Sequence, residues 1–346
     1  MSVVHDVIVV GAGPAGLAAS IVAHQAGLRV LVLEHREGPI DKACGEGLLP
    51  GALRRLGALG VELPPGHPIE GIRFRDAHHA ELTAEGRFRG AARGLRRLAL
   101  SSAMLARADE LGVPLVRRVA RDLTEGSSFV EIDGVRSRYV VAADGLRSPI
   151  RRRLGLTRAA TSPARYGCRR HYRVRSWSAS VEVHLGRDAE AYVTPLAGDE
   201  VGVALLRRGP GGFAETLSRF PLLEARLRGA TPISDARGAG PFEQRVARRV
   251  AGRVLLVGDA AGYLDPLTGE GVALALATAR AAVECIVDER PATYEERYRE
   301  ATARYYRVTS ALLAVARRQR LHRPFLELSR RLPWLFDAAL SYLDGG

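Results

Sequence analysis

Residues 6–16, Asp-Val-Ile-Val-Val-Gly-Ala-Gly-Pro-Ala-Gly, decide the fold of this chain. The run Asp6–Val10 is short, apolar and followed at once by a glycine turn, which is typical of a buried parallel strand. The alanine-rich residues 14–26 then predict a helix, and residues 29–33 form a second apolar run. Strand, glycine turn, helix and strand in this order predict a βαβ unit, the first part of a doubly wound parallel sheet.

The glycines of the turn have separate roles if the turn holds a dinucleotide. Gly11 permits the tight turn, Gly13 lets the backbone approach a pyrophosphate, and Gly16 lets the helix pack closely on the strand. The start of the helix adds free N–H groups and partial positive charge for the phosphates. At the end of the second strand, Glu34 can accept hydrogen bonds from a ribose 2′-hydroxyl. The predicted contacts of this unit, which do not by themselves distinguish FAD from NAD, are Gly11, Gly13, Ala15, Gly16, Glu34 and His35.

A second stretch is Ala143-Asp-Gly-Leu-Arg-Ser148, followed by Arg151. It comes directly after an apolar run, residues 138–142, which predicts another strand. Asp-Gly after a strand is also a common turn, so a purely structural explanation stays open for this stretch taken alone.

A third stretch, Val257-Gly-Asp-Ala-Ala261, continues to Asp265-Pro-Leu-Thr-Gly-Glu-Gly271. Asp259 stands just past a buried strand and a glycine, where a carboxylate can bond a ribityl hydroxyl. The loop 265–271 opens a predicted helix that continues to about residue 286. If this loop meets a flavin pyrimidine ring, the N-terminus of the helix stabilises the negative charge that develops there on reduction.

Together the three stretches resemble those of the flavoprotein superfamily of p-hydroxybenzoate hydroxylase-type monooxygenases, geranylgeranyl reductases and flavin-dependent halogenases, over most of residues 1–290. The resemblance implies one FAD pocket built from distant parts of the chain, with Asp259 on the ribityl chain. It also implies that an arginine at the start of a helix over residues 96–111 contacts FAD, either Arg97, which we favour, or Arg96. The FAD-contacting residues that it adds are Cys44, Gly45, Arg97, Asp144, Gly145, Gly258, Asp259, Pro266, Gly269, Glu270 and Gly271.

The loop Lys42-Ala-Cys-Gly-Glu-Gly47 is the main candidate for a catalytic segment. A Pro-Cys-Gly segment occupies this place in the reductase branch of the superfamily, and here Ala43 replaces the proline. Cys44 could touch the isoalloxazine ring, and Glu46 could act as an acid or base if burial raises its pKa. The alternative is that the loop only packs against FAD.

The composition changes after about residue 160, where four segments alternate as half-exposed antiparallel strands do. We interpret them as a second sheet that carries the substrate cavity, with His171, His184 or Tyr192 facing the substrate. The expected catalytic residues are therefore Cys44, Glu46, His171 and Tyr192.

The predicted fold class is α/β, with two interleaved domains and a helical tail. A Rossmann-like FAD-binding domain with a parallel sheet takes residues 1–74, 95–157 and 247–290. An antiparallel-sheet substrate domain takes residues 75–94 and 158–246, and C-terminal helices follow in residues 291–346.

Composition and residue spacing argue against nucleic-acid binding, a disulfide framework and a metal site. The 346 residues carry a formal net charge of +13, but Lys42 is the only lysine, the arginines are scattered, and no nucleic-acid-binding module is recognisable. Cys44, Cys168 and Cys285 are odd in number and widely spaced, which favours reduced thiols in a cytoplasm. The nine histidines show no metal spacing, and we expect neither a membrane span nor a signal peptide.

The end of the chain, residues 317–343, combines arginines with apolar side chains and predicts an amphipathic helical tail. Such a tail could contact an anionic membrane surface or a lipid-like substrate. It could also be a cover packed on the second domain, which we favour.

Four functions are compatible with these features. We favour an FAD-dependent monooxygenase that transfers oxygen to an aromatic, polyketide-like or other specialised metabolite through a flavin C4a-hydroperoxide. The alternative is a geranylgeranyl reductase-like enzyme that saturates alkenes of an isoprenoid or lipid. The segments 44–47 and 269–271 resemble that family and favour this alternative. Against it, the segment Tyr192-Val-Thr-Pro195 lacks the Trp and Phe of the family's Trp-x-Phe-Pro strand. A halogenase lacks its Trp-x-Trp-x-Ile-Pro segment here, and only the basic tail suggests a membrane-peripheral electron carrier. NADPH or NADH is the expected electron donor, with a flavin reductase or other redox partner as the alternative.

Overall fold

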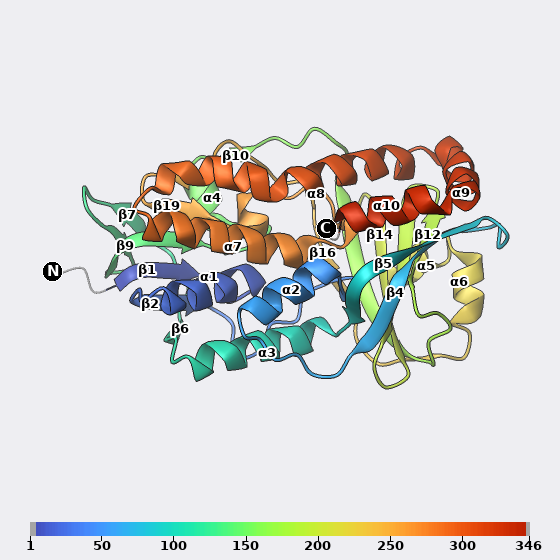
Figure 1. Ribbon diagram of the computed structural model, residues 1–346, viewed down its shortest axis with the longest axis horizontal. Helices are drawn as coiled ribbons and strands as arrows, with labels where there is room; N and C mark the ends of the chain where they lie inside the picture. Colours follow the sequence, from blue (N-terminus) through green and yellow to red (C-terminus); the bar gives the residue numbers. More distant parts are fainter. Residues whose placement is uncertain (1–4, 344–346) are drawn as a thin grey trace.

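The computed structural model describes residues 5–343, which form two sheets side by side with long helices along them (Figure 1). The first sheet has a parallel core in the order β19-β9-β1-β2-β6. The α/β class predicted from the sequence is confirmed. The strands of this sheet are β1 (His5–Val10), β2 (Val30–Glu34), β6 (Leu115–Arg117), β7 (Leu123–Glu125), β8 (Val130–Ile132), β9 (Val135–Ala142), β18 (Val250–Ala251) and β19 (Val254–Leu256).

Small residues let the helices of this half pack closely. The alanine-rich α1 contacts both α3 and α7, and α7 in turn contacts α8. A Cβ added to Gly16 would lie 1.7 Å from the carbonyl oxygen of Gly11, and one added to Gly11 would lie 2.5 Å from that of Ala143. The predicted close approach of strand, turn and helix is therefore present. The helices are α1 (Pro14–Gln25), α2 (Pro50–Ala58), α3 (Arg97–Glu110), α4 (Pro149–Arg153), α7 (Gly271–Val287) and α8 (Tyr294–Ala316), with short 3-10 turns η1 (Gly258–Ala261), η2 (Pro266–Thr268) and η3 (Pro291–Thr293).

The second sheet is antiparallel except where β12 pairs with β4. Its order is β15-β11-β14-β13-β12-β4-β5-β3, with β16 beside β11. The strands are β3 (Gly47–Leu48), β4 (His67–Asp76), β5 (Thr83–Gly94), β11 (Arg165–Arg173), β12 (Val181–Gly186), β13 (Ala189–Leu196), β14 (Glu200–Arg208), β15 (Thr231–Pro232) and β16 (Arg237–Ala239).

The prediction of half-exposed strands in this sheet is wrong for its centre. Every residue of β12 and β13 is buried. One face packs on α5 (Phe213–Leu217) and α6 (Pro221–Arg226), through side chains such as Phe220. The other face packs on α8 and on α9 (His322–Arg331) and α10 (Pro333–Leu343), through side chains such as Phe325. Cover on both faces removes the exposed side that the alternation implied.

The chain crosses between the two sheets several times. β4 begins at His67, so the second sheet includes residues that the sequence analysis assigned to the first domain. A two-stranded ribbon, β10 (Thr157–Arg158) and β17 (Arg245–Val246), lies close to the two later crossing points. The division into domains stays a proposal.

The C-terminal helices cover the second sheet, as we favoured. Both α9 and α10 contact β5, and the short turn η4 (Gln319–Leu321) joins α8 to α9. Within residues 5–343, none of the helices has the length and apolar character needed to cross a membrane.

Candidate functional site

The glycine turn is closed by the carboxylate at the end of β2. The backbone N–H of Ala12 donates to Oε2 of Glu34 at 2.8 Å, and that of Arg36 donates to Oε1 at 3.0 Å. Burial raises the pKa of Glu34, but these two hydrogen bonds and the Arg36 charge outweigh it and lower the pKa. His35 lies on the outside, with Nδ1 2.9 Å from Oε1 of Glu34. Glu34 is thus held as an ionised acceptor beside the turn.

Arg151 joins the second stretch to the third. Its guanidinium is buried, and Nη1 donates to the carbonyl oxygens of Asp259 at 3.2 Å and Ala260 at 3.0 Å. Nη2 donates to the carbonyl oxygen of Leu146 at 2.9 Å and to Oε1 of Gln244 at 2.5 Å. Arg151, at the end of the second stretch, therefore holds both stretches in place.

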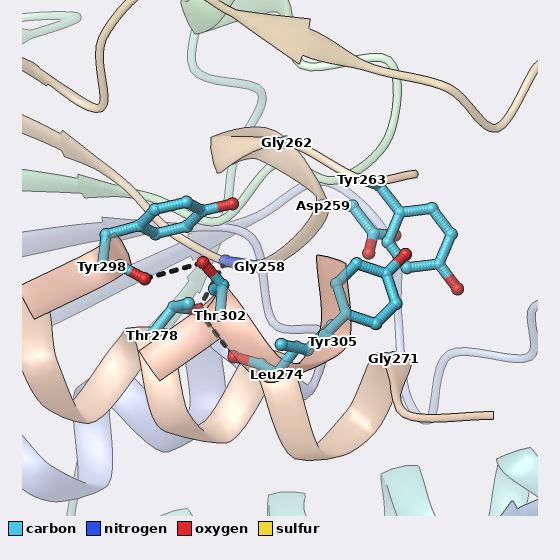
Figure 2. Close-up of a pocket in the computed structure, with 10 residues that line it drawn as sticks. All are labelled: Gly258, Asp259, Gly262, Tyr263, Gly271, Leu274, Thr278, Tyr298, Thr302 and Tyr305. Atoms are coloured by element: carbon cyan, nitrogen blue, oxygen red, sulfur yellow. Dashed lines mark hydrogen bonds between the residues drawn. The ribbon is translucent and has the colours of Figure 1, made fainter. Parts of the chain in front are cut away.

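The third stretch is anchored to α7 and α8. Gly258, with a φ of 56°, donates its N–H to Oγ1 of Thr278 on α7 at 3.0 Å. Figure 2 shows a small pocket here, in which Tyr298 and Tyr305 of α8 lie across from Gly258 and Asp259. In the loop that precedes α7 in the chain, Gly269 has a left-handed φ of 72°. In the same loop, the Asp265 carboxylate accepts a hydrogen bond from the backbone N–H of Leu267 at 3.1 Å. The loop with Pro266, Gly269, Glu270 and Gly271 therefore opens α7 as predicted.

Two of the predicted catalytic residues, Glu46 and His171, form a buried pair. Nε2 of His171 lies 2.7 Å from Oε2 of Glu46, and both side chains are almost fully buried. Nη1 of Arg169, which can only donate, lies 3.1 Å from Nδ1 of His171. Nδ1 is therefore the acceptor, and Nε2 carries the proton that it donates to Glu46. The other oxygen of Glu46 accepts the backbone N–H of Arg97 at 2.9 Å.

Cys44 lies next to this pair. The backbone N–H of Glu46 lies 3.4 Å from Sγ of Cys44. Burial raises the pKa of the Cys44 thiol, the charge of Arg97 opposes this, and the charge of Glu46 adds to it. The thiol therefore keeps its proton at neutral pH. We refer to Cys44, Glu46 and His171 as the thiol–carboxylate–imidazole cluster.

Tyr192 lies near a second group of charges, formed by Glu190, Asp265 and Arg165. Its hydroxyl is buried without a hydrogen-bond partner among the described residues, and burial raises its pKa well above the ordinary value. Nearby, Arg165 forms a two-point ion pair with Glu190 at 3.1 and 2.6 Å and lies 2.8 Å from Asp265. Burial raises the pKa of Asp265 to about 6, partly opposed by Arg165. Tyr192 is a neutral phenol here, so it can donate or accept a hydrogen bond but supplies no charge.

The alternative histidine, His184, lies on the opposite face of the second sheet from His171. It lies with Nε2 3.4 Å from Glu182, whose other contacts include Nε1 of Trp177 at 2.9 Å. These side chains point toward α6, whereas His171 points toward the loop 42–47. His184 therefore does not face the loop 42–47, and its contact with substrate stays a prediction.

The three stretches, together with Gly45 and Arg97, fit an FAD molecule. A Cβ added to Gly13 or Gly45 would meet no atom within 4 Å, so the backbone is open to a flat ligand at both places. Two buried polar atoms, Nη1 of Arg97 and Oδ1 of Asp144, have no hydrogen-bond partner among the described residues. A cationic donor and a carboxylate oxygen beside an open glycine backbone match the phosphates and hydroxyls of a dinucleotide.

Comparison with known proteins leads to the same cofactor. A family model described as FAD binding domain matches residues 4–69. The chain is 31% identical over 339 residues to digeranylgeranylglycerophospholipid reductase 1 of Methanopyrus kandleri, which covers 88% of this chain and 87% of that protein. It is also 30% identical to the menaquinone reductase of Mycobacterium tuberculosis, which covers 82% and 77%. This chain belongs to the geranylgeranyl reductase family of FAD-dependent oxidoreductases.

The fold is shared more widely than the family. The structure of the flavin-dependent brominase Bmp2 superposes with a TM-score of 0.84 over 99% of this chain and 93% of that one, at 18% identity. At this identity the likeness concerns the fold alone. The family membership therefore rests on the two reductases, and the protein is an oxidoreductase enzyme.

Two residues that shape the site, Arg169 and Thr194, were not among the predicted catalytic or cofactor-binding residues. Arg169 fixes the tautomer of His171 and binds Oδ1 of Asp41 at 2.5 Å. Thr194 holds the candidate loop by donating to the carbonyl oxygen of Gly45 at 2.6 Å. Arg169 stands two residues before His171, so strand periodicity could have placed both on one face. No such local signal exists for Thr194, because its contact depends on how the two sheets meet.

Proposed function

We propose that this protein is an FAD-dependent reductase that saturates carbon–carbon double bonds in the isoprenoid chain of a lipid or quinone. From the sequence alone we ranked this function second to monooxygenation; the names of the two reductases support ranking it first. The observation that carries the proposal is an apolar cluster that reaches the FAD-binding stretches. Leu146 of the second stretch and Tyr263 and Leu267 of the third belong to the same buried cluster as the second sheet.

This cluster has the composition expected around an isoprenoid chain. Its side chains include Phe74 and Leu185 of the sheet and Phe336 of α10. A small pocket within it is lined by Phe74, Leu185, Leu267, Leu312, Val315, Ala316 and Phe325. On the side of the candidate loop, a Cβ added to Gly47 would touch Ile69 and Val181. An alkene chain held in the cluster would therefore lie between the loop 42–47 and η2.

Saturation of an alkene requires a hydride on one carbon and a proton on the other. FAD, when bound and reduced, supplies the hydride. The protein must then supply the proton, and the Cys44 thiol is suited to do so because burial keeps it protonated. After the transfer, the charge of Arg97 stabilises the thiolate, since its effect on Cys44 is to lower the pKa.

The pair behind the thiol can return the proton. His171 already carries a proton on Nε2, and its Nδ1 lies 2.9 Å from Oγ of the half-buried Ser234. A proton taken up near Ser234 can thus pass through the imidazole to the carboxylate of Glu46, whose charge acts on the nearby Cys44 thiol. In this proposal Cys44 is the proton donor, and Glu46 and His171 recharge it.

The test is a single turnover of the reduced holoenzyme under anaerobic conditions. The reduced protein is mixed with a geranylgeranyl lipid or a menaquinone, and flavin reoxidation and the product mass are followed. The proposal expects reoxidation that depends on substrate and a product heavier by two hydrogen atoms per double bond. A product that appears only with oxygen and is heavier by one oxygen atom would instead support monooxygenation. In the same apparatus, the oxidised protein is mixed with NADPH or with NADH, and the bleaching of the flavin absorbance shows which of them, if either, is the electron donor.

A further inference from the structure

The only lysine of the chain lies at the junction of the FAD-binding stretches. Nζ of Lys42 is 3.2 Å from Oδ2 of Asp259, the first acidic residue of the third stretch. A Cβ added to Gly145, in the second stretch, would lie 3.7 Å from the same Nζ. The backbone next to Gly145 also borders the glycine turn, because a Cβ on Gly11 would lie 3.3 Å from the amide nitrogen of Asp144. The ammonium group therefore lies between the second and third stretches, and the second stretch borders the glycine turn.

A purely structural role does not account well for this lysine. The side chains of Lys42 and Asp259 are 39% and 28% exposed, and ion pairs this open to solvent contribute about 0–1 kcal/mol to stability. An ammonium group has three N–H donors, and the contact with Asp259 uses one of them. The other two donors can bind a ligand.

The charges around Lys42 favour an anion. Arg97 is buried nearby and its charge interacts with Asp259, while its Nη1 has no hydrogen-bond partner among the described residues. On the other side, burial raises the pKa of Asp144, which reduces its tendency to carry negative charge. Asp41 and Glu46 also act on Arg97, but they are paired with Arg169 and His171. Lys42 and Arg97 therefore stand beside one partly exposed carboxylate, Asp259, and the first turn of α1 adds its own partial positive charge.

We infer that Lys42 is a ligand of the FAD diphosphate and that Asp259 holds it in position. In FAD the ribityl chain is bonded directly to the diphosphate. A cation in contact with the carboxylate that takes a ribityl hydroxyl is thus within reach of the adjacent phosphate. Lysine suits this role because its ammonium is a compact charge that binds phosphate without requiring a planar, two-point geometry. The inference concerns FAD binding and does not depend on which reaction the enzyme catalyses.

The first experiment measures FAD affinity of the flavin-stripped variants Lys42→Gln and Lys42→Arg by fluorescence titration. Loss of a charge-assisted hydrogen bond should weaken FAD by about tenfold or more in Lys42→Gln and flatten its salt dependence, whereas Lys42→Arg should stay close to wild type. Arg29→Gln is the matched control, because Arg29 pairs with Asp6 at the opposite end of β1 and its loss changes the net charge equally. Equal FAD affinity in Lys42→Gln and Arg29→Gln would overturn the inference.

Two further measurements separate direct contact from indirect effects. Because Lys42 is the only lysine, an amine-acylating reagent reports on it through a single tryptic peptide, and FAD should protect that peptide several-fold. Lys42→Gln should also weaken FAD further in an Asp259→Asn background. Equal labelling with and without FAD, or no added loss in the double variant, would mean that Lys42 only positions Asp259 and would overturn its role as a diphosphate ligand.

Discussion

Glu46 has an unusual backbone conformation next to Cys44. Its φ of 60° is in the left-handed region, which costs a non-glycine residue of order 1–3 kcal/mol. The conformation persists because contacts on both sides fix it: the carboxylate binds His171 and the Arg97 backbone, and the Glu46 carbonyl oxygen accepts the N–H of Leu95 at 2.9 Å. A conformation held at this cost beside Cys44 is consistent with a functional role.

The variant Glu46→Gln tests whether the Glu46 carboxylate carries a proton between His171 and Cys44. The amide keeps the shape of the side chain but cannot pass a proton between His171 and Cys44. We expect FAD affinity to remain within a few-fold of wild type, the first turnover to be nearly normal, and later turnovers to slow by about 10²-fold or more, because the thiol is not recharged. Rapid-quench analysis of successive turnovers checks this. Glu131→Gln, which removes a partly exposed carboxylate on β8 that pairs with Arg136, is the control, and equal steady-state rates in both variants would contradict the prediction.

At the scale of elements, the two glycines that flank the start of α1 allow a matched comparison. A Cβ on Gly13 meets nothing within 4 Å in the protein, whereas a Cβ on Gly16 would lie 1.7 Å from the carbonyl oxygen of Gly11. Gly13→Ala should therefore keep the melting temperature and weaken FAD binding. Gly16→Ala should force α1 away from β1 and destabilise the flavin-free protein by several kcal/mol. Thermal unfolding of both flavin-free variants, with FAD titration of Gly13→Ala, distinguishes the roles; the same loss of stability in both would show that they are not separate.

The buried carboxylate of Glu182, on the face of the second sheet that α6 covers, makes the free energy of unfolding depend on pH. Burial raises the pKa of Glu182, but hydrogen bonds from His184 and Trp177 and the charge of Arg75 outweigh it and lower the pKa to about 2, from 4.5. Because the folded pKa is depressed, this carboxylate stabilises the fold fully above pH 4.5, and the contribution is lost as pH falls through about 2. The full effect is about 3 kcal/mol.

Urea unfolding followed by fluorescence measures this effect. Between about pH 5 and about pH 3 the wild type should lose roughly 2 kcal/mol more stability than Glu182→Gln, because the amide does not titrate. Glu70→Gln, at an exposed position, serves as the control and should follow the wild type. Parallel pH profiles for Glu182→Gln and the wild type would assign the acid sensitivity to other groups.

Features made by neighbouring segments could be predicted from the sequence, whereas features that join distant segments could not. The βαβ unit was predictable because strand, turn and helix are neighbours along the chain, and the predicted helix over residues 14–26 differs from α1 by one residue. The burial of β12 and β13 was not, because it depends on helices more than 100 residues away in the chain that cover the second face. The contact between Glu46 and His171 spans 125 residues and depends on how one loop meets the second sheet. The candidates could be named from their chemistry, whereas their pairing required the fold.

At the scale of the whole molecule, the C-terminal helices combine an apolar interior with a basic exterior. Six arginines and one glutamate lie in residues 317–331, and Leu328 and Trp334 are 55% and 64% exposed. The inner side of the same helices supplies Phe325 to the apolar pocket. Figure 1 shows α9 at one end of the molecule and α10 running from there back toward the middle, beside β5. A lipid substrate would have to enter this pocket from a membrane, so a surface that attracts anionic lipids belongs beside it.

We therefore expect the protein to bind anionic vesicles through α9 and α10, although the helices also cover the sheet. Each exposed arginine near an anionic surface contributes about 1 kcal/mol, and this attraction is screened by salt. Flotation with phosphatidylglycerol vesicles at low salt should recover the protein, and neutral phosphatidylcholine vesicles should not. The variant Trp334→Ser with Arg330→Gln and Arg331→Gln should lose most of the binding, while Leu98→Ser, which removes an exposed apolar side chain on α3, should not. Equal flotation of both variants would place any membrane contact elsewhere on a protein whose overall charge is +13.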